Sequence, residues 1–346
     1  MPEISVIMAT ARGDYPIIGM PNVHLFDPTL KSLAKQSFRD FELIIVDALY
    51  DRRRYDFSKY PFPSKHVPPH PRHRFWLDRG MWNVCGMLNT ALLYCEGELI
   101  VRIDDCSEFK EWYLQRFWEE YQSGYFPMAM HIRYHAGKPA RVNEEYLKKG
   151  YEAKYAQMPG EDRAMLLKRL YGEEGIVRDT RWPTVERVGR MIAPPEWFYG
   201  YSSFSLDAIL KVNGFNELCD ATKGQEDQEL GVRLAMAGYR DFLLDKDLWV
   251  IEHEHLPCEV KSPPPFKCNL GIILWDKRTG TYRANERRLT KEDCDWIRNN
   301  ICPECPNYRR CVGEHLRGRF YVEGELFDLW LNHQPIFNLR EEMLEV

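Results

Sequence analysis

Strand-length apolar runs alternate with helical stretches over the first 110 residues, and this alternation constrains the fold most. Residues 4–9, 41–46 and 99–103 are short, β-branched or apolar runs, and residues 28–36 and 82–95 carry apolar side chains at helical spacing. Parallel strands need such crossover helices, because each strand must start at the same end of the sheet. The sequence therefore predicts an α/β domain with a Rossmann-like mixed, mostly parallel sheet.

Acidic residues stand where two of these predicted strands end. Asp47 follows the second run, and Asp104 and Asp105 follow the third. Ligands of open α/β sheets bind beyond the carboxyl ends of the strands, so we expect the three carboxylates to face one crevice. Paired carboxylates there suit a hard divalent cation that also holds substrate phosphates. A solvated turn or a helix N-cap is the structural alternative, because Asp is favoured in both.

Composition limits the classes of function. The 346 residues include 47 Lys+Arg and 52 Asp+Glu, and the resulting formal net charge of −5 disfavours a globally basic nucleic-acid binder. The longest apolar runs are far shorter than the roughly 20 residues of a spanning helix. The N-terminus lacks the basic and apolar regions of a signal peptide. We therefore expect a cytoplasmic protein with reduced thiols and no transmembrane segment.

Four motifs occur in order along the chain. They read ISVIMAT at residues 4–10, LKSLAKQSFRDFELIIVD at 30–47, LNTALLYCEGELIVRIDD at 88–105, and NGFNE followed by GQEDQELGVRL within 213–234. Together they resemble family 2 glycosyltransferases, and the resemblance covers roughly residues 3–255. It implies the GT-A nucleotide-diphospho-sugar transferase fold. It also implies an enzyme that moves a sugar from a nucleoside-diphosphate sugar to a hydroxyl of a glycan or other acceptor, with inversion.

The resemblance places a donor site at the carboxyl ends of the first strands. Thr10, Ala11 and Arg12 fall in the loop that lines the nucleotide pocket of the family. Asp47 falls at the carboxylate that recognises the nucleotide base or ribose. Arg102 and Asp104, on and after the third strand, complete the expected donor-binding set.

The resemblance also implies a metal site for Mn²⁺ or Mg²⁺. Asp104 matches the first Asp of the family's DXD motif, but the third position is Cys106, a softer ligand that suits these ions poorly. Either Asp105 takes over ligation or metal binding is weaker. His253 and His255 point the same way along an extended segment, and one of them is expected to complete the site. Exposed strand-end histidines are the alternative.

Glu226 and Asp227 occupy the family's Gly-X-Glu-Asp motif, at the start of a predicted helix over residues 226–236. In inverting members this Asp is the general base that removes the proton of the attacking acceptor hydroxyl, so we assign that role to Asp227. Glu226 is predicted to assist catalysis or to position the acceptor, or to do no more than offset the helix dipole. Trp197 and Tyr199 are expected to border the acceptor or, equally, to be core residues.

A Cys-containing appendage follows three prolines at residues 263–265. The sequence predicts a GT-A domain at residues 1–258 and this appendage at residues 259–346. Four of its residues have spacing that suits a structural Zn²⁺ site, and free thiols or disulfides are the alternatives. These residues are Cys302, Cys305, Cys311 and His315.

Residues 51–80 are locally basic, with eight Lys/Arg and three Asp, so their net charge is 8 − 3 = +5. A diphosphate needs about two compensating charges, and the excess leaves room for an anionic acceptor such as modified DNA. A solvated basic loop is the simpler interpretation, and nucleic acid is not the favoured partner. A glycan- or nucleic-acid-binding module that kept the fold and lost metal chemistry remains an alternative function.

Overall fold

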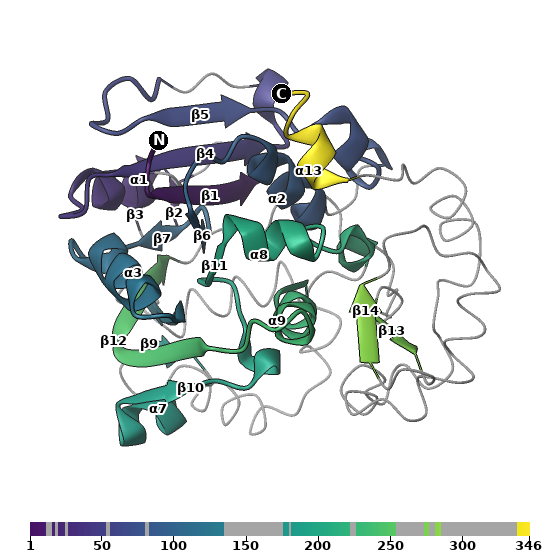
Figure 1. Ribbon diagram of the computed structural model, residues 1–346. Helices are drawn as coiled ribbons and strands as arrows, with labels where there is room; N and C mark the ends of the chain where they lie inside the picture. Colours follow the sequence, from purple (N-terminus) through teal and green to yellow (C-terminus); the bar gives the residue numbers. More distant parts are fainter. Residues whose placement is uncertain are drawn as a thin grey trace, which may run out of the picture.

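The computed structural model of the chain has two five-stranded sheets with helices around them (Figure 1). It describes residues 1–11, 16–17, 20–24, 27–52, 56–79, 83–134, 176–179, 181–221, 226–253, 273–276, 281–284 and 338–346. Several predicted site residues lie outside these ranges. They are Arg12, His255 and the four residues of the predicted zinc site, Cys302, Cys305, Cys311 and His315.

The first sheet has the strand order β11-β6-β1-β4-β5. β1 (Ile4–Thr10) pairs in parallel with both β4 (Phe41–Asp47) and β6 (Leu99–Ile103), and β5 (Ser64–Val67) pairs in parallel with β4. β11 (Ser203–Ser205) is antiparallel to β6 at one edge. The predicted mixed, mostly parallel α/β sheet is therefore confirmed.

Helices cover both faces of this sheet, because its strands are apolar on both sides. In β1, Val6 and Met8 belong to one apolar cluster and Ile7 belongs to the other, as the two-residue period of a strand requires. α1 (Asp27–Ala34) and α3 (Tyr113–Gln122) contribute to the first cluster, and α2 (Val84–Leu93), α8 (Leu206–Lys211) and α9 (Glu226–Met236) contribute to the second.

The second sheet joins segments that are far apart in the sequence. β8 (Phe126–Tyr134) pairs in parallel with β12 (Phe242–His253). β9 (Ile176–Arg178), β10 (Arg190–Ile192) and β7 (Ser107–Glu108) complete the sheet with antiparallel pairings. Because β7 follows the acidic pair almost directly, its pairing places the end of β12 beside the turn that carries Asp104 and Asp105.

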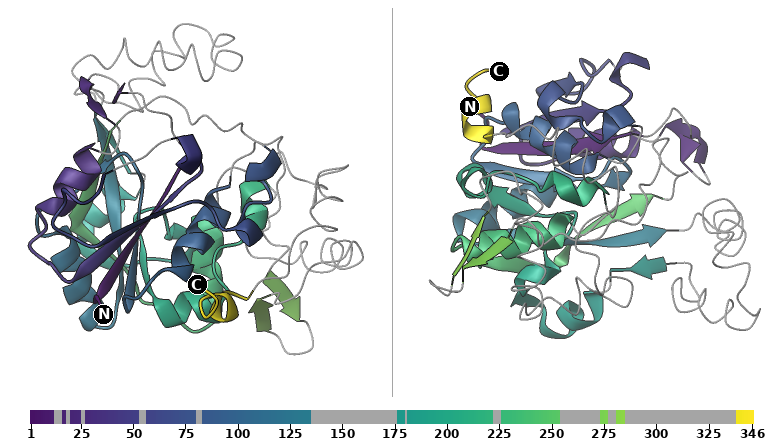
Figure 2. Two further views of the ribbon diagram at one scale, coloured as in Figure 1. Left: turned by 90° about the horizontal axis from the view of Figure 1, so that it is seen from above. Right: turned by 90° about the vertical axis from the view of Figure 1, so that its right-hand side faces the viewer.

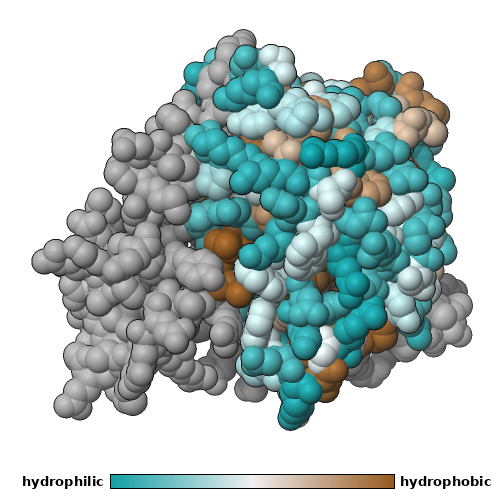
Figure 3. All heavy atoms as spheres, turned by 90° about the vertical axis from the view of Figure 1, so that its left-hand side faces the viewer, coloured by the Kyte–Doolittle hydropathy of each residue, from teal (hydrophilic) through white to brown (hydrophobic). Residues whose placement is uncertain are grey.

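The remaining elements are short. They are β2 (Pro16–Ile17), β3 (Met20–His24), β13 (Ile273–Asp276), β14 (Thr281–Ala284), α7 (Trp182–Val188), and the 3₁₀ turns η1 (Tyr50–Arg52), η2 (Pro71–His73), η3 (Leu77–Arg79), η4 (Pro195–Trp197) and η5 (Glu217–Ala221). On the face in Figure 3 the described surface is mainly hydrophilic, with hydrophobic side chains in small separate groups. Within the described ranges, no helix has the length and apolar character needed to cross a membrane.

The end of the chain packs against the first sheet's helical layer. α13 (Leu339–Glu342) lies beside α2, as two of the views show (Figures 1 and 2). Leu339 is fully buried in the apolar cluster of α2, and its backbone N–H donates to Asn213 Oδ1 at 3.1 Å. Of the predicted appendage, residues 338–346 thus pack on the predicted GT-A domain.

Gly214 is expected to be essential for this packing. Its φ is +76°, and a Cβ atom there would lie 2.3 Å from Leu339 Cδ1 and 2.4 Å from Asn89 Oδ1. We expect Gly214→Ala to lower the free energy of unfolding by about 2–5 kcal/mol, since it adds overpacking to a left-handed backbone. Gly238→Ala is the control, because Gly238 has φ +106° with open space around it, and should lose about 1–2 kcal/mol. Urea unfolding measures both, and equal losses would contradict the close packing of Leu339.

Candidate active site

The ends of β1 and β4 meet at one edge of the first sheet, as the sequence predicts. Thr10 and Asp47 are direct partners in the parallel register, and the Ala48 N–H donates to the Thr10 carbonyl at 2.8 Å. Ala11 follows in a buried position. Three of the predicted donor-binding residues are therefore neighbours.

Asp47 is fully buried, and both of its carboxylate oxygens have partners. Oδ1 accepts the Leu49 N–H at 2.8 Å, and Oδ2 lies 3.0 Å from His66 Nε2. The His66 ring packs against Tyr50 and Phe57, with ring centroids 4.9 and 5.2 Å away. Asp47 is thus enclosed at the sheet edge with His66 and these rings around it, and its role in nucleoside recognition stays a prediction. His66 was not among the predicted site residues, although its place in the parallel strand β5 is a signal that points to it.

The two adjacent aspartates differ in their surroundings. Asp105 is buried, and its Oδ2 accepts the hydroxyl of Thr10 at 2.7 Å. Asp104 is half-buried, and its Oδ2 lies 3.7 Å from the place that a Cβ on Gly200 would take. Burial raises the pKa of Tyr113 and Tyr201 well above the ordinary value, and the charge of Asp104 adds to both shifts. Asp104 is thus the aspartate of this pair that a ligand can approach.

Cys106, at the third position of the motif, belongs to the core. Its side chain is buried in an apolar cluster that includes Ile103, Phe109 and Tyr113. A thiol in that position does not compete with the carboxylates for a ligand. The other residues predicted to bind the ion, Asp104, Asp105 and His253, offer carboxylate oxygens and an imidazole nitrogen, and their role as ligands stays a prediction.

His253 lies beside the same turn. Its backbone N–H donates to the Cys106 carbonyl at 2.8 Å, and its Nε2 lies 3.0 Å from Glu108 Oε2. The β7–β12 pairing therefore brings His253 close to the acidic pair, although its imidazole is bonded to Glu108. Its role as a metal ligand stays a prediction.

Arg102 connects this strand end to the start of α9. Its Nη2 donates to Glu226 Oε1 at 3.3 Å, and its Nη1 lies against Asp227 Oδ1. All three side chains are buried, and the guanidinium also lies over the ring of Phe215, 5.9 Å from its centroid. Arg102, which the sequence analysis assigned to the donor, thus holds the two predicted catalytic carboxylates beside the strand that leads to Asp104.

Gly231 of α9 allows this helix to pack closely against η4 and Phe198. A Cβ on Gly231 would lie 2.3 Å from both Phe198 Cβ and the Pro195 carbonyl, so a larger residue would push the helix away from η4. The aromatic stretch at residues 197–201, beside α9, contains both core residues and a residue exposed enough to border an acceptor. Phe198 and Tyr201 are core residues, whereas Tyr199 is 44% exposed. Trp197 is partly buried.

Tyr199 borders a polar group that the sequence analysis missed. Its ring lies over the Arg181 guanidinium at 5.5 Å and 5.9 Å from the His131 ring. Arg181 Nη2 donates to Asp179 Oδ2 at 2.5 Å, and His131 Nδ1 lies 3.3 Å from the same oxygen. Burial alone would raise the pKa of Asp179, but the hydrogen bonds and charges of Arg181 and His131 together outweigh it and hold this pKa well below its usual range. No sequence signal marks this group, since its members come from separate segments.

Thr10 is expected to stabilise the fold through Asp105. Thr10→Val keeps the shape of the side chain but leaves a buried carboxylate without its hydroxyl partner, which should lower the free energy of unfolding by about 1.5–3 kcal/mol. Thr10→Ser keeps the hydroxyl and loses one methyl group, about 0.8 kcal/mol. Urea unfolding compares the two variants. A Ser variant as unstable as the Val variant would show that the Thr10–Asp105 bond contributes nothing.

Comparisons with known proteins give structural similarity at low sequence identity. No protein-family model and no curated protein matches the chain. A mannosyltransferase from Pyrobaculum calidifontis, solved in complex with GDP-Man and Mn²⁺, is 18% identical with a TM-score of 0.42, over 72% of this chain and 56% of that one. S. aureus TarS in complex with UDP-GlcNAc is 15% identical with a TM-score of 0.36, over 74% and 60%. The chain thus covers less than two thirds of each.

Proposed function

We propose that the chain is an inverting glycosyltransferase of the GT-A type that uses a nucleoside-diphosphate sugar. The observation that carries this proposal is the contact of Arg102 with both Glu226 and Asp227. It joins a carboxylate pair from α9 to β6, the strand that Asp104 follows. Proton removal needs a carboxylate base, and binding of a diphosphate through a metal ion needs carboxylate ligands. Here the first set begins helix α9 and the second follows β6, and Arg102 of β6 contacts the first set.

The donor would bind at the carboxyl ends of β1, β4 and β6. His66 and Asp47 would meet the nucleoside, and Thr10 fixes Asp105 at the edge of the site. Asp104, with Asp105 and His253 beside it, would hold Mn²⁺ or Mg²⁺. When bound, such an ion offsets the negative charge of the leaving diphosphate.

Asp227 would act as the general base. Arg102 contacts it at one oxygen, Oδ1, and so fixes the carboxylate beside the strand that leads to Asp104. The carboxylate takes the proton of the acceptor hydroxyl while that oxygen bonds to the anomeric carbon. The bond from this carbon to the diphosphate breaks, and its electron pair leaves with the nucleoside diphosphate. Inversion follows, because attack and departure occur on opposite faces.

Glu226 and Tyr199 would position the acceptor. Within the part of the chain that the structure describes, Glu226 Oε2 is buried and has no hydrogen-bond partner. A buried carboxylate oxygen in that state is expected to take a polar ligand such as an acceptor hydroxyl. The exposed ring of Tyr199 offers a flat face to a sugar. The acceptor class is therefore a glycan or another hydroxyl compound.

A panel of nucleoside-diphosphate sugars with Mn²⁺ tests the proposal. The expected result is release of nucleoside diphosphate from at least one donor, with transfer or slow hydrolysis, and an inverted anomeric configuration by NMR. Absence of turnover with every donor and metal would refute it. The alternative is a non-catalytic module, for which Cys106 is the motivating feature: the thiol is buried in the core, so a metal site here would depend on Asp104 and its neighbours.

A further inference from the structure

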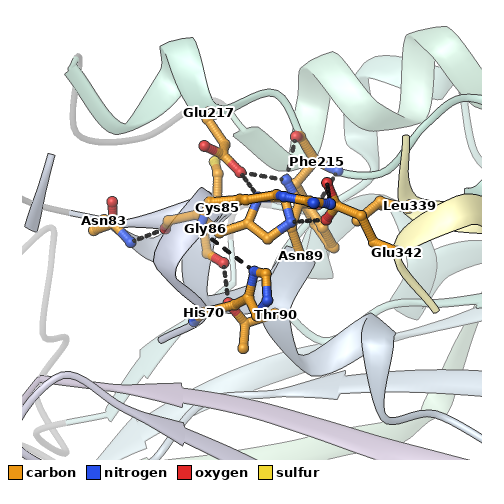
Figure 4. Close-up of polar contacts among 12 residues, drawn as sticks. His70, Asn83, Cys85, Gly86, Asn89, Thr90, Phe215, Glu217, Leu339 and Glu342 are labelled. Carbon is orange, nitrogen blue, oxygen red and sulfur yellow. Dashed lines mark hydrogen bonds and ion pairs between the residues drawn. The ribbon is translucent and has the colours of Figure 1, made fainter. Parts of the chain in front are cut away.

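Three side chains outside the proposed transfer site converge beside α2 (Figure 4). His70 is the N-cap of η2, His73 is the last residue of η2, and Glu342 is the last residue of α13. One nitrogen of each imidazole and one oxygen of Glu342 all lie within 4.8 Å of one another. The loop after β5 and the C-terminal helix thus meet through groups that can bind a metal ion.

His73 is the centre of this group. It is fully buried, its Nδ1 lies 2.5 Å from Glu217 Oε1, and its Nε2 lies 2.8 Å from Glu342 Oε2. A neutral imidazole has a single N–H, so one of these two contacts cannot be an ordinary hydrogen bond. Burial lowers the pKa of His73, but the charges and hydrogen bonds of Glu217 and Glu342 outweigh this and raise it to about 9, so a second proton accounts for both contacts. A metal ion that replaces this proton requires Nε2 and the Glu342 oxygen to move apart from their 2.8 Å separation.

The charges around His73 favour a cation. Glu217 and Glu342 are buried carboxylates on the two sides of the His73 ring. Burial and the nearby charge of Glu217 raise the pKa of buried Asp220 well above its ordinary value, so Asp220 adds little negative charge here. Arg72 Nη1 lies 3.2 Å from Glu342 Oε1 as an ion pair, without hydrogen-bond geometry. A cation in place of the second His73 proton would meet the same two carboxylates, since buried charges require a partner of opposite sign.

The ligand types indicate the class of ion. Two imidazoles and one carboxylate are the protein ligands of many zinc sites that leave a fourth position open. Histidine ligands of such sites commonly donate their other N–H to a carboxylate, and Glu217 has that position on His73. Asn89 Nδ2 donates to the same Glu217 oxygen at 2.9 Å and so fixes it.

His70 provides the third ligand and access to solvent. It is half-buried, and its Nδ1 accepts the Arg72 N–H at 3.4 Å, a long bond that the ring can exchange for a metal bond. A tetrahedral ion with bonds of about 2.0–2.1 Å holds its ligand atoms about 3.4 Å apart. The observed limit of 4.8 Å therefore calls for only small side-chain movements.

We propose that His70, His73 and Glu342 bind one zinc-class divalent cation, which ties α13 to the loop after β5. The ion would fix the end of the chain on the α2 side of the first sheet. Metal binding at this site does not depend on the proposed transfer reaction, so each proposal is tested separately.

Calorimetric titration of the metal-free, full-length chain with Zn²⁺ tests the proposal. Wild type and Glu345→Gln should bind the ion, since Glu345 is on the same segment and contacts Arg72 but is not a ligand. His70→Ala and Glu342→Gln should lose one equivalent or bind it at least about 10-fold more weakly. His70→Ala keeps the test valid if Glu342→Gln loosens α13. Unchanged binding in His70→Ala, or an equal loss in Glu345→Gln, overturns the proposal.

Co²⁺ distinguishes this site from the predicted cysteine site and from Asp104. Nitrogen and oxygen ligands give Co²⁺ weak visible bands, whereas thiolate ligands add an intense charge-transfer band in the near ultraviolet. The thiolate-free signal that remains in Asp104→Asn should be lost when His70→Ala is added to that variant. A spectrum that shows thiolate ligation alone and does not change in His70→Ala contradicts the proposal.

Discussion

Replacing Asp227 with Asn is expected to lower kcat by about 10²–10⁴-fold, the usual contribution of a general base. The amide keeps the size of the side chain and can still accept a hydrogen bond from Arg102, so the fold should persist. Donor affinity should stay within about threefold of wild type, because the base acts on the acceptor. Steady-state turnover and calorimetric donor binding measure the two effects.

Glu226→Gln is the matched control for this variant. Like Asp227→Asn, this variant removes one of the two carboxylate charges that contact Arg102, and the two positions are adjacent in α9. Its main expected effect is a higher acceptor KM, with kcat within about tenfold of wild type, because positioning groups contribute through binding. Equal losses of kcat in the two variants would show that the charge balance around Arg102, rather than proton removal by Asp227, limits the reaction.

Asp104→Asn is expected to remove the metal dependence of donor use. Loss of a carboxylate ligand should lower the affinity for Mn²⁺ by about 100-fold or more, since even groups that only support a ligand contribute 10–100-fold. Stability should change little, because Asp104 is half-buried. Turnover measured against Mn²⁺ concentration, beside an unfolding curve, tests this.

The control for Asp104 is Asp207→Asn. Asp207 is an exposed carboxylate of α8 that pairs with Arg340. This variant should show the Mn²⁺ dependence of wild type. A metal response in Asp104→Asn that equals that of Asp207→Asn would remove Asp104 from the metal site.

The sequence predicts the parallel sheet and its acidic edge well, because both depend on local patterns. The predicted strand at residues 99–103 and helix at residues 226–236 have the same bounds as β6 and α9. Parallel strands place their carboxyl ends together, so the approach of Thr10, Asp47 and Asp105 follows from topology alone.

Side-chain pairings between distant segments could not be predicted in this way. Arg102 reads as a donor contact from its motif, yet its partners are Glu226 and Asp227, more than 120 residues away. Cys106 is buried because it shares an apolar cluster with residues of α3, which the sequence does not reveal. Likewise, nothing near Glu342 in the sequence indicates that it meets His73. These contacts arise from packing between layers, which periodicity does not encode.

Calorimetric titration of the wild-type chain with nucleoside-diphosphate sugars, with Mn²⁺ and with chelator, tests the central claim most directly. The account predicts saturable one-to-one binding of at least one donor, tightened at least about tenfold by Mn²⁺. Failure of every donor to bind, with metal and without it, would contradict the assignment of this strand edge as a nucleotide-sugar site.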